Sequence, residues 1–160
     1  MYSYIVLLHV VGAFVFALSH GVSVAVALRL RSVTSRDRAA ALLDLSQMAT
    51  GGLYVGLVLL LIGGVWAAFA AGLWDRAWIW ASIGALVAVI VAMYAIATPF
   101  YGRMRVAAGA STNPQMQARY GDLGADELAT MAASSRPIAL AVIGAAGLLF
   151  IVWLMVVKPF

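Results

Sequence analysis

Four long stretches of this sequence contain no Asp, Glu, Lys or Arg, and they constrain the fold more than any other feature. Each is longer than the about 20 apolar residues with which an α-helix crosses the hydrocarbon core of a bilayer. None alternates polar and apolar residues with period two, so a transmembrane barrel is not predicted. The uncharged stretches are residues 1–28, 45–74, 77–102 and 137–157.

The sequence therefore predicts an all-α, polytopic membrane protein whose four transmembrane helices form one bundle. We expect a single membrane domain over residues 1–160, because the four spans leave no room for a soluble catalytic domain. The N-terminal stretch lacks a basic region and is long enough to span, so we expect a retained first helix and not a cleaved signal peptide. The predicted helices cover about residues 4–30, 51–73, 77–99 and 137–157.

The arginines predict the orientation. Four lie after the first span, at 29, 31, 36 and 38, and four after the third, at 103, 105, 119 and 136. By the positive-inside rule the loops 31–50 and 101–136 are cytoplasmic, and both termini are outside. All five tryptophans then fall in the outer half, as an interfacial aromatic belt or, alternatively, a ligand cage. Because the basic residues border the membrane, the net charge of +4 does not indicate nucleic-acid binding.

Both predicted cytoplasmic loops carry helix signals. Ser35 can cap a helix that runs into the second span, with an adjustment possible at Gly51 and Gly52. Asn113 and Pro114 have the types expected at an N-cap and the first helical position. Asp126 and Glu127 then suit the first turn of another helix. We expect a helical connector on the bundle, with a cytoplasmic lid as the alternative.

Small residues are frequent within the spans. Gly52 and Gly56 form a small-xxx-small pair, which allows close approach of transmembrane helices. Packing inside the bundle and pairing with a second copy of the chain both explain this spacing. No internal repeat is evident, so an inverted-repeat transporter is not favoured.

The two histidines of the chain, His9 and His20, both lie in the first uncharged stretch. They are eleven residues apart, close to three helical turns, so they are predicted to point the same way, about 16 Å apart along the axis. Ionisable residues inside a membrane are candidates for function. The structural alternative is an interhelical hydrogen bond, worth about 0.6 kcal/mol on average.

The surroundings of the histidines allow a haem b site in which His9 and His20 are the candidate axial ligands. Gly12 would let a flat macrocycle approach the backbone, and Ser19 or Ser23 would accept a hydrogen bond from an imidazole. Two histidines on one helix cannot face each other across one haem. The second ligand would come from a homodimer partner, another subunit, a methionine, a tyrosine or water. Candidate methionines are Met48, Met93, Met131 and Met155. No catalytic residues are predicted, and the chain has no cysteine for thiol or iron–sulfur chemistry.

Four short motifs, "LLHVVGA", "RAWIWASIG", "ATPFYGRMR" and "LMVVKPF", resemble a family of small four-helix predicted integral membrane proteins. That family is similar in layout to the copper-resistance D-type and protoporphyrinogen oxidase J-type membrane proteins. The resemblance implies a four-helix bundle, and the second group implies haem binding. His9 matches the early histidine of the first helix in those relatives, whereas "FVFALSHG" stands where the J-type proteins have a tryptophan-glycine stretch.

Three functional hypotheses follow. The first is a haem b-binding electron-transfer or accessory subunit of a respiratory or photosynthetic complex in the cell inner membrane. The second is a cofactor-free structural or assembly subunit, in which the histidines only join helices. The third is a small transporter, which the uncharged spans disfavour. The lipid bilayer and a homodimer partner or larger membrane complex are the expected partners.

Overall fold

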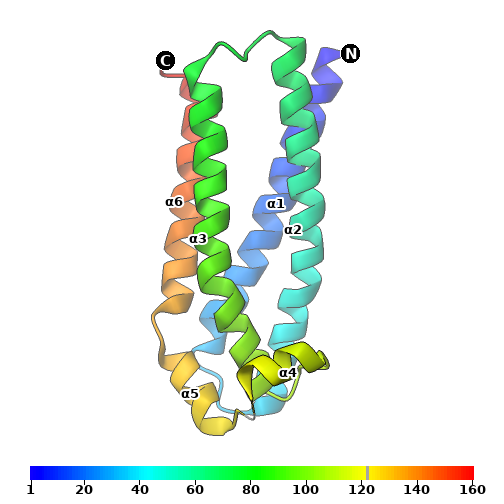
Figure 1. Cartoon of the computed structure of the whole chain (residues 1–160). Helices are drawn as coiled ribbons and strands as arrows, with labels where there is room; N and C mark the ends of the chain where they lie inside the picture. The colour runs from blue at the N-terminus through cyan, green and yellow to red at the C-terminus, as the bar shows by residue number, and fades with distance from the viewer. Residues whose placement is uncertain (122) are drawn as a thin grey trace.

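The computed structural model describes residues 1–121 and 123–160, and every regular element in those residues is a helix. Four segments are long and apolar enough to cross a membrane: α1, α2, α3 and the segment that ends with α6. The predicted all-α four-helix bundle is thus confirmed (Figure 1). In chain order the helices are α1 (Tyr2–Leu30), α2 (Arg36–Ala70), α3 (Ala77–Ala107), α4 (Pro114–Tyr120), α5 (Ala125–Ala133) and α6 (Arg136–Val157).

The two ends of the bundle differ in composition. Figure 1 shows both ends of the chain at one end of the bundle, beside the turn between α2 and α3, with α4 and α5 at the other. We call the first the tryptophan-rich end, since Trp74, Trp78 and Trp80 flank its turn, and the second the arginine-rich end. Trp78 is buried and lies under the ammonium group of Lys158, 5.5 Å from the ring centroid, whereas Trp80 stays exposed.

The helix signals in the connecting segments are confirmed. The Ser35 side chain accepts a hydrogen bond from the Arg38 amide, and α2 then runs unbroken through Gly51 and Gly52. Asn113 accepts from the Gln115 amide at 2.9 Å and caps α4. Asp126 and Glu127 lie in the first turn of α5. Each cap satisfies a backbone donor that the helix itself leaves free.

Helix α3 continues eight residues beyond the predicted span, through Pro99. Proline removes one backbone donor and disfavours the helix interior. The residues that follow it nevertheless bury their side chains fully: Phe100, Met104 and Ala107 are all 0% exposed. This burial holds the last turns of α3 in place at the arginine-rich end.

The bundle consists of two helix pairs, α1 with α2 and α3 with α6 (Figure 1). A large apolar core closes it at the arginine-rich end, and a small one around Trp78 and Ile79 closes it at the tryptophan-rich end. Between these two cores the pairs enclose a cavity. The larger core is formed by Val26, Ala27, Leu30, Val33, Ala39, Leu43, Phe100, Met104, Ala107, Ala108, Leu128, Met131 and Leu140.

Helices α1 and α2 touch along a glycine seam, which we define as Gly12, Gly52, Gly56 and Gly63. A Cβ on Gly56 would lie 2.8 Å from Phe16 Cα, and one on Gly63 would lie 2.6 Å from His9 N. The helices therefore meet backbone to backbone, which maximises van der Waals contact in a medium with no hydrophobic driving force between helices. The Gly52-xxx-Gly56 spacing serves this contact within the chain.

Replacing Gly56 by Ala should destabilise the bundle by about 1–3 kcal/mol, because the added methyl group overpacks the seam. Gly84→Ala is the matched control, since nothing lies within 4 Å of a Cβ at that position of α3. Unfolding in mixed detergent micelles, followed by circular dichroism, measures both variants. If the two variants are equally stable, α1 and α2 do not make close contact at Gly56.

The predicted orientation can be tested because the chain has no cysteine. Ser32 and Asp75 are exposed at opposite ends of the bundle. In spheroplasts a membrane-impermeant maleimide should label Asp75→Cys, and should label Ser32→Cys only after lysis. The reverse labelling pattern would show that the chain has the opposite orientation in the membrane.

Candidate functional site

The imidazole of His9 is fixed against α2. Its Nδ1 lies 2.8 Å from the backbone carbonyl oxygen of Leu60, an acceptor only, so Nδ1 carries the proton and donates it. Glycine at position 64 makes room for the ring, because a Cβ there would lie 2.9 Å from Nδ1. With the proton on Nδ1, the lone pair is on Nε2, as in many metal-binding histidines that donate from the other nitrogen.

The imidazole of His20 lies against the opposite helix pair. A Cβ on Gly144 of α6 would collide with Nε2 of the His20 ring and would lie only 2.7 Å from its Cε1. Nε2 is buried and has no hydrogen-bond partner among the described residues. The ring of Phe16, one turn away, is nearly parallel to it at an interplanar angle of 11°. The half-buried His20 thus places a buried polar atom, Nε2, at the contact between the two pairs.

Both histidines line the same cavity, which has a volume of about 1300 Å³. The two rings contact different helices, however, since His9 lies against α2 and His20 against α6. All four long helices contribute to the wall, which is mostly apolar. The volume exceeds the roughly 300–1,000 Å³ of typical small-molecule sites.

The glycines and serines named from the sequence lie in different surroundings. The open side of Gly12 faces the backbone of Leu59 and Leu60, so its missing side chain serves the glycine seam and is not available to a macrocycle. Ser19 also lies in the seam, where its Oγ would be 2.5 Å from a Cβ on Gly52. Ser23 lines the cavity, and its carbonyl accepts a hydrogen bond from the Tyr101 hydroxyl at 2.7 Å.

Two of the four candidate methionines line the cavity and two do not. Met93 and Met155 line the cavity. Met48 is 77% exposed, and Met131 belongs to the apolar core at the arginine-rich end. Only the first two are therefore placed to meet a group held within the cavity.

At the arginine-rich end the cavity wall includes Arg105. Its guanidinium donates to the carbonyl of Leu43 and approaches Asp44 Oδ1 at 3.5 Å. The Arg105 side chain is only 14% exposed. The charge of Arg105 is therefore already partnered by groups of α2.

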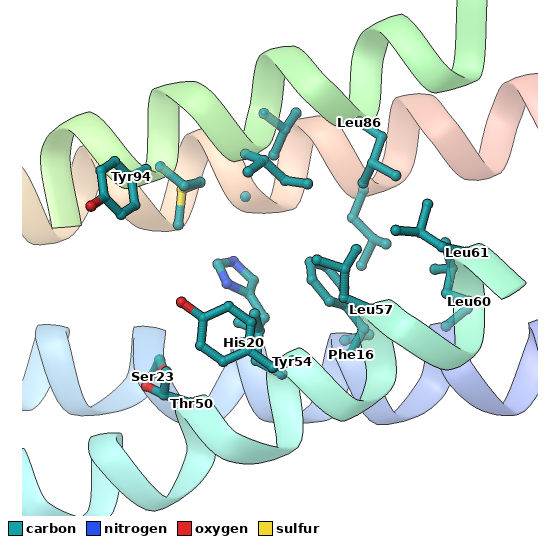
Figure 2. A pocket seen from close by; sticks show the side chains of 18 of the residues that line it. Phe16, His20, Ser23, Thr50, Tyr54, Leu57, Leu60, Leu61, Leu86 and Tyr94 are labelled. Atoms are coloured by element: carbon teal, nitrogen blue, oxygen red, sulfur yellow. The ribbon is translucent and has the colours of Figure 1, made fainter. Parts of the chain in front are cut away.

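Several groups around the two histidines could not be predicted from the sequence. Nothing in the pattern points to the carbonyl of Leu60, because every residue of a helix has one. Tyr54 of α2 and Tyr94 of α3 flank the cavity near His20 (Figure 2). Their spacing in the sequence carries no signal, since the pairing of helices decides which residues share a wall.

The contact between His20 and Gly144 can be tested by a double-mutant cycle. Gly144→Ala should destabilise the protein by about 1–3 kcal/mol through overpacking. In a His20→Ala background the same substitution should cost much less, because the ring it strikes is gone. Unfolding free energies in detergent give the coupling, and additive values would show that the two residues do not touch.

No group of three or more metal-ligating side chains comes together in the part of the chain that the structure describes. Comparison of the chain with protein-family models, with curated proteins and with solved structures finds no match.

Proposed function

We propose that this chain binds haem b in the cavity between its two helix pairs, with His9 as an axial ligand. It would serve as an electron-transfer or accessory subunit of a respiratory or photosynthetic complex in the cell inner membrane. The observation that carries the proposal is the hydrogen bond from His9 Nδ1 to the Leu60 carbonyl at the cavity wall. It orients the ring and leaves Nε2 available to iron.

The donor set fits one haem per cavity better than two. His9 meets the requirement for an axial ligand, whereas the Nε2 of His20 packs against Gly144 and has no space beside it for a metal. Met93 and Met155 line the same cavity and are the candidate methionines for the second axial position. A residue from a homodimer partner or another subunit is the alternative source.

A bound haem supplies one-electron redox chemistry, and the chain supplies its environment. The hydrogen bond to Leu60 selects the tautomer of His9 and fixes the orientation of its ring. Apolar side chains such as Leu61, Leu86 and Leu148 line the cavity and exclude water. A dry, low-dielectric wall favours the less charged, reduced state of a haem.

A cofactor-free structural role is the second candidate. It is favoured by the packing of His9 on Gly63 and Gly64, which by itself accounts for the polar ring as a link between α1 and α2. In that case the partner of the chain is a larger membrane complex, and the purified protein is colourless.

Reduced-minus-oxidised spectra of the purified chain test the haem proposal. The wild-type protein should show a b-type spectrum, and His9→Ala should lose most of it. Loss of the hydrogen bond alone removes only about 0.6 kcal/mol on average, so the variant should remain folded. The control is Ser19→Ala, which alters the seam but removes no ligand. A well-folded wild-type protein without any haem band after growth with added haem precursor would falsify the proposal.

A further inference from the structure

His20 is a half-buried residue that the proposed haem site does not use, and its Nε2 atom is fully buried. Its Nε2 has no partner in the described residues and faces the Gly144 backbone. A buried N–H without an acceptor costs about 1–3 kcal/mol, so the lower-energy tautomer leaves Nε2 unprotonated against α6. Nδ1 then carries the proton, and the ring offers a hydrogen-bond donor in a region where water cannot serve as its acceptor.

The surroundings of this donor are aromatic. Figure 2 shows the imidazole between Tyr54 of α2 and Tyr94 of α3, with Phe16 on one side and Ser23 on the other. Phe16 lies nearly parallel to the imidazole, at 6.4 Å between centroids. Flat, parallel surfaces of this kind suit a planar ring better than the ester group of an acylglycerol.

This part of the cavity opens sideways. Tyr54 is 60% exposed and Tyr94 is 68% exposed, and both line the cavity on the side where α2 and α3 face each other. Because these two side chains both line the cavity and are exposed, they connect the region of His20 with the surface that faces lipid. A hydrophobic molecule can therefore enter from the bilayer without crossing the aqueous phase.

The charges around the cavity favour a neutral ligand. No Asp, Glu, Lys or Arg is present in the spans at the depth of His20. The nearest lining cation along α3, Arg105, is already bound to Leu43 and Asp44. The wall toward the tryptophan-rich end is apolar, with Leu57, Leu86 and Ile151 among its residues, and suits a long hydrocarbon tail.

We propose that the His20 end of the cavity binds the ring of an isoprenoid quinone. The imidazole donates a hydrogen bond to one ring carbonyl oxygen, Tyr54 and Tyr94 flank the entrance, and the tail follows the apolar wall. The site goes beyond the proposed haem site and does not require it, because His9 and His20 are about 16 Å apart along α1.

Calorimetric titration of the purified full-length protein with decylubiquinone tests the site. Wild-type protein should show saturable binding, and decylbenzene, which keeps the tail but lacks the carbonyls, should bind at least about tenfold more weakly. His20→Leu should weaken quinone binding by about the same factor, whereas His20→Gln retains a donor and should stay within about threefold of wild type. His9→Leu, which removes the proposed haem ligand, should still show saturable quinone binding, and this separates the result from the fate of the haem proposal.

Two further measurements keep the test decisive if His20→Leu does not fold. Tyr54→Ala and Tyr94→Ala change exposed positions and should each weaken quinone binding. In infrared spectra the carbonyl band of the quinone should shift to lower frequency on binding to wild type. The proposal fails if that shift is absent, if decylbenzene binds as tightly as the quinone, or if dioleoylglycerol displaces the quinone at equal concentration.

Discussion

Backbone contact between α1 and α2 is the interaction on which the rest of this structure depends. Inside a bilayer the backbone must satisfy its own hydrogen bonds, and lipid offers no solvent from which apolar helices are expelled. Close approach at Gly12, Gly56 and Gly63 supplies the attraction instead. The same approach brings His9 within hydrogen-bonding distance of the Leu60 carbonyl. Packing and the orientation of the candidate ligand thus have a common cause.

Much of the fold could be predicted from the sequence, because its signals are local. Uncharged stretches longer than a bilayer is thick predict the four spans, and Ser35 and Asn113 mark helix starts by the chemistry of their side chains. The pairing of the helices could not be predicted in the same way. Glycines recur in α1, α2, α3 and α6, and only three-dimensional placement shows that Gly52 faces Ser19 and Gly147 faces Val89.

The candidate site could be predicted only in part. His9 and His20 stand out because ionisable side chains are rare inside a membrane. Their separate roles depend on groups without a sequence signature: a backbone carbonyl for His9, and the bare backbone of Gly144 for His20. Gly12 illustrates the difficulty, since a glycine near a histidine fits a cofactor site and a helix contact equally well until the facing element is known.

The separation between seam and cavity has a consequence for how such a protein can change. The residues that hold α1 to α2 are small and face inward to each other, whereas Tyr54, Leu86 and Ile151 face the space between the pairs. Substitutions on the cavity wall can therefore change the shape of the cavity while α1 and α2 keep their backbone contact. The helix contacts and the cavity wall are formed by different residues, so the wall can vary in sequence while the bundle keeps its packing.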